Sequence, residues 1–135
     1  MRILGVDPGL LRTGYGLIES GGPDRMKLIE AGTIKTSSGE GISQRVACIY
    51  RNLTEIIKEH KPRVLVLEKL YSHYKHPATS ILMGHARGVV CLTCGINDVE
   101  LINYNTLTSF VNGNSCLRIL GRVSRNSNSP RPHYI

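Results

Sequence analysis

A short, uninterrupted apolar run, Val64–Leu67, is the feature that most restricts what this chain can fold into. A run with no polar side leaves no face for solvent, which is typical of a strand buried on both faces in the parallel part of an α/β sheet. The run follows Pro62 and ends in a carboxylate, Glu68. The sequence therefore predicts a layered α/β domain with this strand inside the sheet.

Three further strands are expected before this run. Arg2–Asp7 predicts a short buried strand that also ends in a carboxylate, and Thr13–Glu19 predicts a second strand. Met26–Lys35 predicts a third strand with a kink at its glycine. Pro8-Gly9 and the segment 21–24 have turn sequences, and short turns between consecutive strands indicate an antiparallel meander.

Two helices and a last strand complete the expected order. Apolar residues at three- and four-residue steps from Val46 to Ile57 predict a helix that ends near His60. Ala78–Cys94 predicts a second helix, and Val99–Tyr104 predicts the last strand. We therefore expect a mixed sheet, with three antiparallel strands followed by parallel strands, flanked by helices.

Charge and composition narrow the class of partner. With 135 residues and 41% hydrophobic residues the chain suits one globular domain, and its net charge of +7 favours an anionic partner, nucleic acid first. All ten acids lie between Asp7 and Glu100, so residues 101–135 are basic and acid-free. We expect no membrane-spanning run and no secretory signal, and hence a cytoplasmic protein.

The pair Cys91 and Cys94 has a CxxC spacing, which is typical of zinc or redox sites. A zinc site needs two more ligands with similar spacing, and none is evident in the sequence. We therefore interpret these cysteines as buried or half-buried thiols in an apolar helix.

Asp7 and Glu68 are the candidate catalytic residues, because each closes a buried strand where the chain leaves the sheet. If the two strands are neighbours, the two carboxylates lie close together and repel each other unless they share a cation or a proton. Carboxylate oxygens are ligands that suit Mg²⁺ or Mn²⁺. Gly9, Gly14 and Gly16 let a ligand's backbone approach Asp7 closely. One alternative is that each acid only caps the next helix or points into solvent. The other is a phosphate-binding loop of a sugar-kinase-type ATPase, although no Walker-type lysine follows the glycines.

Three sequence blocks carry a family resemblance. Met1–Leu10 followed by Thr13–Gly16, then Val66–Tyr71, then Gly84–Val89 resemble in order and spacing the RuvC family of Holliday-junction resolvases. The resemblance is strong from Met1 to about Tyr104 and weak beyond it.

This resemblance implies a ribonuclease-H-like fold and a homodimer. It also implies Mg²⁺-dependent, symmetric nicking of four-way DNA junctions in recombination and repair, with two ions in each active site and a branch-migration helicase complex as a partner. Asp7 and Glu68 are similar to the first and second catalytic carboxylates of the family. Tyr71 is similar to an aromatic that stacks on unpaired bases near the junction centre, the alternative being an interface or surface aromatic.

Further contacts are expected around these blocks. Lys69, Lys75 and Arg87 are candidate DNA-binding residues, and the polar segment His73–His76 either contacts phosphate or is a solvated loop. The helix Ala78–Cys94 resembles the one that forms the family's dimer contact.

The C-terminal part of the chain departs from the family pattern. Pro130 to His133 resembles the start of the family's last metal-binding motif, which makes His133 a candidate catalytic and metal ligand. We expect the fourth acid and the last helix to be missing, as in a truncated or altered family member. We accordingly divide the chain into a nuclease core, residues 1–111, and a divergent, basic and poorly ordered segment, residues 112–135.

Two other hypotheses stay open beside a junction-resolving endonuclease. One is a catalytically inactive dimer that binds junction DNA but lacks the fourth metal ligand. The other is a sugar-kinase-like ATPase domain on a similar fold, which predicts nucleotide binding.

Overall fold

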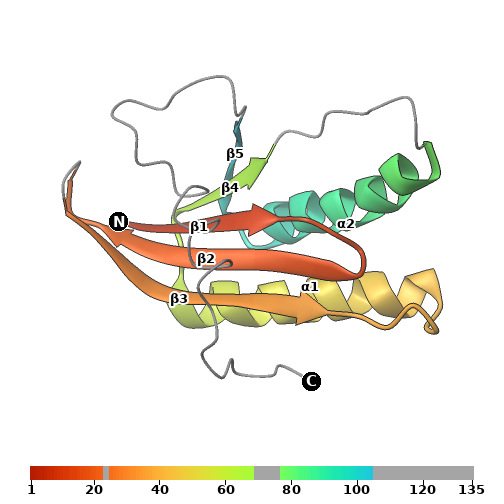
Figure 1. The fold of residues 1–135 in the computed structure, drawn as a ribbon. Helices are drawn as coiled ribbons and strands as arrows, with labels where there is room; N and C mark the ends of the chain where they lie inside the picture. Colours follow the sequence, from red (N-terminus) through yellow and green to blue (C-terminus); the bar gives the residue numbers. More distant parts are fainter. Residues whose placement is uncertain (23–24, 69–76, 105–135) are drawn as a thin grey trace.

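The computed structural model describes residues 1–22, 25–68 and 77–104, whose elements follow the expected order (Figure 1). The strands are β1 (Arg2–Asp7), β2 (Arg12–Ser20), β3 (Met26–Lys35), β4 (Val64–Glu68) and β5 (Glu100–Tyr104). The helices are α1 (Ile42–His60) and α2 (Pro77–Ile96). The predicted elements are therefore confirmed, with differences of a few residues at their ends.

The five strands form one mixed sheet in the order β3-β2-β1-β4-β5. Pairing is antiparallel between β1 and β2 and between β2 and β3, and parallel between β1 and β4 and between β4 and β5. Tight turns are sufficient for the antiparallel strands, whereas the parallel strands need crossovers, and α1 and α2 provide them. β4 lies between β1 and β5, as its continuous apolar sequence predicts.

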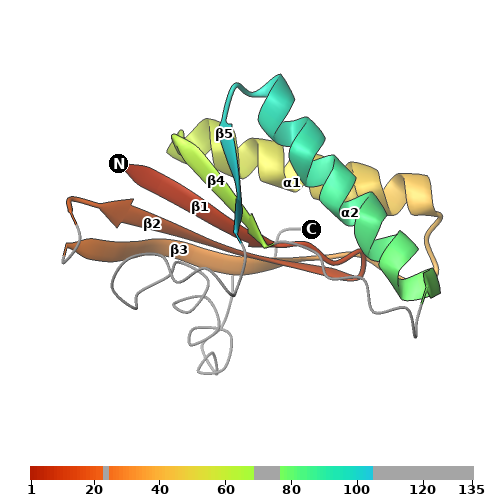
Figure 2. The same cartoon turned by 90° about the horizontal axis from the view of Figure 1, so that it is seen from above.

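Both described helices pack on the same face of the sheet (Figure 2). Successive side chains of a strand point to opposite faces, so every second residue of β1 and β4 meets the helices. The buried core contains strand residues Leu4, Val6, Tyr15, Leu17, Ile34, Leu65 and Leu67, and helix residues Ile49, Leu53, Ile56, Ile57, Ala86, Val90 and Cys94. Each large apolar side chain buried here stabilises the fold by about 1.5–3 kcal/mol.

Local chemistry sets the ends of α1. At the start, the backbone N–H of Gly41 donates to Oε1 of Gln44 at 3.1 Å, which satisfies a group that the helix leaves unpaired. At the end, Lys61 adopts a left-handed conformation with φ of 47° and donates its N–H to the carbonyl of Ile57 at 2.8 Å. Pro62 follows directly and cannot continue the helix.

The irregularity expected in β3 lies elsewhere than at its glycine. The register between β2 and β3 shifts between Leu17 and Ile18, opposite Ile29. Gly32 has a different role, because a Cβ there would lie 2.7 Å from the hydroxyl oxygen of Tyr15. The predicted kink at this glycine is therefore wrong, and its missing side chain instead makes room for a buried tyrosine ring.

We expected no stretch of the chain to be long and apolar enough to cross a membrane. This prediction is wrong for α2, whose 20 residues are long and apolar enough by length and composition. A core helix passes the same test, so this is weak evidence for a membrane. Ala86, Val90 and Cys94 of α2 lie in the core of the domain.

Candidate active site at the carboxyl end of the sheet

Asp7 and Glu68 are the last residues of two neighbouring strands. β1 and β4 pair in parallel with Val6 opposite Leu67, so the next residues, Asp7 and Glu68, are opposite one another at the carboxyl end of the sheet. Strands in a sheet lie about 4.8 Å apart, which brings the two carboxylates close together. The predicted meeting of these two acids is therefore present in the structure.

The carboxylates lie on the face of the sheet that points away from α1 and α2. Val6 and Leu67, the preceding residues, are fully buried in the core under the helices. The alternation of side chains along a strand therefore places Asp7 and Glu68 on the opposite face. Asp7 is exposed and Glu68 is half-buried, so both remain accessible to a ligand.

Glycines leave the surface of the sheet beside Asp7 free of side chains. Gly14 on β2 is opposite Asp7, and a Cβ built at Gly14 would lie 3.9 Å from the Cβ of Asp7. Further along, Gly5 is opposite Gly16, so the strip next to the carboxylates presents backbone and no side chains. A bulky ligand such as a phosphate backbone has space to approach Asp7 from this side.

The turn between β1 and β2 is held in one conformation. A Cβ at Gly9 would lie 2.4 Å from the carbonyl oxygen of Arg12, so the turn requires glycine there. The hydroxyl of the buried Thr13 donates to the carbonyl of Gly9 at 2.9 Å. The hydroxyl of Thr36 donates to the carbonyl of Leu10 at 2.5 Å and ties the same turn to the end of β3.

The electrostatics of the pair fit a cation site. Burial, and after it the negative charge of Asp7, raises the pKa of the Glu68 carboxyl above its ordinary value. A bound cation would oppose both effects, because it stabilises the charged form of each acid. Within residues 1–22, 25–68 and 77–104 no group of three or more His, Cys, Asp or Glu residues gathers to hold a metal. In the described part of the chain, Asp7 and Glu68 are therefore two potential metal ligands without a third from these residue types.

Arg87 on α2 supports the strand end that carries Glu68. Its Nη1 donates to the backbone carbonyl of Glu68, and its Nη2 donates to Oδ1 of Asn103 on β5. The half-buried guanidinium therefore links α2 to the ends of β4 and β5, and it positions Glu68. Its contact with DNA stays a prediction.

The other predicted site residues lie outside the described residues. These are Lys69, Tyr71, Lys75 and His133, together with the segment 112–135. The binding and catalytic roles predicted for them stay predictions.

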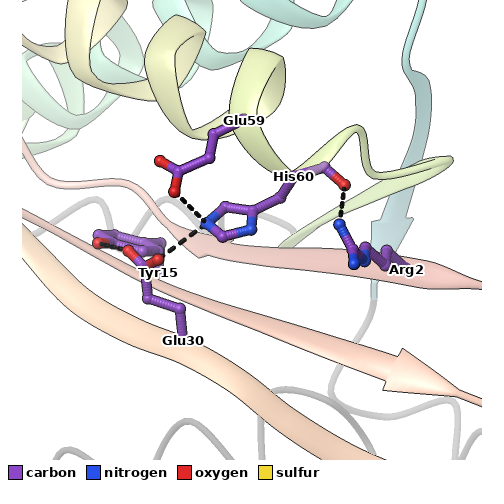
Figure 3. A network of polar contacts seen from close by, with 5 residues as sticks. All are labelled: Arg2, Tyr15, Glu30, Glu59 and His60. Carbon is purple, nitrogen blue, oxygen red and sulfur yellow. Dashed lines mark hydrogen bonds and ion pairs between the residues drawn. The ribbon is translucent and has the colours of Figure 1, made fainter.

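A polar cluster on the helix side of the sheet was not predicted from the sequence (Figure 3). The hydroxyl of Tyr15 donates to Oε1 of Glu30 at 2.6 Å, and Nε2 of His60 lies 2.8 Å from Oε2 of the same carboxylate. Nη1 of Arg2 donates to the carbonyl of His60 at 2.9 Å. These contacts join β2, β3 and the end of α1 to the start of β1. Glu30 is opposite the core residue Leu17, and this register could not be predicted from the sequence.

Among the residues that the structure describes, Cys91 and Cys94 of α2 belong to no group of three or more potential metal ligands. Cys94 lies in the core and Cys91 is half-buried, both as free thiols. Burial first, and the neighbouring Cys91 second, raises the pKa of the Cys94 thiol to about 11. This thiol is therefore protonated at neutral pH, which suits the interpretation as a buried apolar side chain.

Comparison with known sequences identifies a family. The family model described as crossover junction endodeoxyribonuclease RuvC matches residues 3–114. A relative of that name from Rhodopirellula baltica is 45% identical over 102 residues, which are 76% of this chain and 57% of the relative. Another from Caldicellulosiruptor saccharolyticus is 42% identical over 107 residues, which are 79% of this chain and 64% of the relative. The chain thus spans between 57% and 64% of the length of these two relatives.

Solved structures confirm the fold class. RuvC of T. thermophilus in complex with Holliday junction substrate has a TM-score of 0.72 and 23% identity, over 78% of this chain and 65% of that chain. The yeast mitochondrial Holliday junction resolvase has a TM-score of 0.57 and 12% identity, over 76% of this chain and 50% of that chain. At such identities the likeness shows the fold, which is the predicted ribonuclease-H-like mixed α/β sheet.

Proposed function

This chain belongs to the RuvC family of crossover junction endodeoxyribonucleases, and from this premise we propose that it nicks four-way DNA junctions in recombination and repair. The observation that carries the proposal is the pair of acids, Asp7 and Glu68, at the accessible carboxyl end of β1 and β4. Paired carboxylates suit phosphodiester hydrolysis, since they hold the hard cations that neutralise phosphate charge. The net charge of +7 favours nucleic acid as the anionic partner.

The donor set fits Mg²⁺, with Mn²⁺ as a substitute. Asp7 and Glu68 supply hard oxygen ligands, and the raised pKa of Glu68 marks a negative pair that a cation would stabilise. We assign His133 as a third ligand and two ions to each active site by resemblance to the family. When bound, such ions activate water and stabilise the leaving oxygen.

The residues of the chain itself position the DNA. Asp7 and Glu68 would hold these ions beside the reacting phosphate, while the glycine strip at Gly14 and Gly16 lets the strand approach. We assign base stacking at the junction centre to Tyr71, a contact worth about 1–3 kcal/mol per base. Lys69, Lys75 and Arg87 are the accompanying DNA contacts.

Symmetric nicking requires two active sites, and α2 offers a surface for a homodimer. Ile81, Leu92 and Ile96 are exposed by 63%, 57% and 56% respectively. Gly84 and Gly88 lie on the same helix face, and neither has any other group within 4 Å of the Cβ position. A second copy of α2 can approach this backbone closely and cover the apolar side chains. A branch-migration helicase complex as partner and a cytoplasmic location complete the proposal.

The test is nicking of a synthetic four-way junction in the presence of Mg²⁺ or Mn²⁺. We expect paired nicks in opposing strands from the wild-type chain and a loss of at least 100-fold in rate for Asp7→Asn and for Glu68→Gln. Glu55→Gln, an exposed acid on α1, is the matched control and should cleave like the wild type.

Each outcome of this test is informative. Equal traces from wild type and Asp7→Asn, or no metal-dependent cleavage at all, would exclude nuclease activity for this chain. Selective binding of four-way over linear DNA without any cleavage would identify it instead as the catalytically inactive junction-binding alternative.

A further inference from the structure

Two cations are directly opposite each other near the proposed active site. Arg12 at the start of β2 and Lys35 at the end of β3 are partners in the register of the sheet, and both are exposed. Like charges at opposite positions of neighbouring strands destabilise a sheet, so this pair has a cost in the isolated chain. In the described part of the chain no ion pair joins either residue to an acid.

The pair lies on the same face of the sheet as the catalytic candidates. Thr13 and Ile34, their neighbours in the chain, are buried against the helix side. Arg12 and Lys35 therefore belong to the opposite face, where Gly14 is opposite Asp7. With strands about 4.8 Å apart and about 3.3 Å per residue, the Cα atoms of Arg12 and Lys35 lie roughly 8 Å and 12 Å from that of Asp7.

The segment that carries Arg12 is built to be rigid. Thr13 and Thr36 hold the turn before it through the carbonyls of Gly9 and Leu10. Nε of Arg45 on α1 donates in turn to the hydroxyl of Thr36 at 3.1 Å. A backbone that is already fixed loses less conformational entropy when the residue it carries binds an anion, which favours binding.

We propose that Arg12 and Lys35 form a phosphate-binding pair that holds the DNA strand on the β3 side of Asp7, away from Glu68. This inference rests on the proposed nuclease function and adds a binding site to it. A span of roughly 8–12 Å from the scissile position corresponds to a few nucleotides, since one strand of a duplex advances about 3.4 Å per phosphate. Gly14, which lies between Asp7 and Arg12 in the register of the sheet, adds no side chain to this path.

The experiment measures binding to a four-way junction in EDTA, so that no cleavage occurs, at several salt concentrations. Removing two phosphate contacts should lower the slope of log K against log salt by about 1–2. We expect this from the double variant Arg12→Gln, Lys35→Gln. The matched control, Arg51→Gln with Lys58→Gln, removes two exposed cations of α1 and should keep the wild-type slope. The charge-retaining double variant Arg12→Lys, Lys35→Arg should also keep it.

An unchanged slope in the glutamine variant would overturn the inference, and so would an equal drop in the α1 control, which would reveal only an effect of total charge. The proposed function would survive both results, because the wild type would still bind the junction. No junction binding by the wild type would overturn the proposed function and this pair with it. If the double variant lacks a thermal transition, Lys35→Gln alone should show about half of the expected drop.

Discussion

The ionisation of Glu68 links one residue of the site to the stability of the metal-free protein. Burial and the charge of Asp7 raise the pKa of Glu68 above 4.5, so the folded state holds this proton more tightly than the unfolded chain does. The contribution of Glu68 to stability is therefore complete below pH 4.5 and is lost as pH rises through the folded-state pKa.

We accordingly expect Glu68→Gln to become more stable relative to the wild type as pH rises from about 4 to about 7, because glutamine cannot ionise. Thermal melts in EDTA across this range measure the difference. Glu55→Gln on α1 serves as the control for the loss of an exposed acid. If the stabilities of the wild type and Glu68→Gln changed equally with pH, the pKa of Glu68 would not be raised by burial and by the charge of Asp7.

At the scale of elements, α2 has two faces with different tasks. Ala86, Val90 and Cys94 face the core, whereas the exposed stripe that includes Ile81 and Leu92 has no described partner in the chain. Burying one leucine at a helix contact contributes about 1.5–3 kcal/mol, and a buried unpaired carboxylate costs several kcal/mol more.

Leu92→Glu should therefore weaken a homodimer by at least 100-fold while the subunit stays folded. Light scattering on eluting fractions and sedimentation across a concentration series measure the change in mass. Thr79→Glu, an exposed change on the same helix, is expected to leave the mass of the dimer unchanged. A wild-type chain that is monomeric at all concentrations would contradict the assignment of this face.

At the scale of the whole molecule, a divalent cation should couple to folding. A ligand that binds only the folded state stabilises it by RT ln(1 + [L]/Kd), about 2.7 kcal/mol at one hundred times Kd. We expect Mg²⁺ to raise the melting temperature of the wild type by several degrees at that concentration, and Asp7→Asn with Glu68→Gln to remove most of this rise. Differential scanning calorimetry with and without Mg²⁺ provides the measurement. An equal rise in the double variant would place the cation elsewhere.

Much of the architecture was predictable because burial imposes a local pattern. Val64–Leu67 was identified as an interior strand since a run without polar positions fits only there, and the structure places β4 between β1 and β5. Asp7 and Glu68 stood out because each ends such a strand. Arg12 and Lys35 did not, because nothing local links residues so far apart in the chain.

Sequence alone determined the order of the elements, the mixed sheet and the two carboxylates, since side-chain periodicity and turn residues act over a few positions. Only the tertiary structure decided the strand register, and with it the cation pair opposite one another, the Tyr15–Glu30–His60 cluster and the link from Arg87 to Glu68. The physical reason is that the register of a strand depends on which of its side chains are buried against the helices, and this is decided only when the sheet and the helices pack together. A shift of one strand by one residue would move the side chains of that strand to the other face of the sheet.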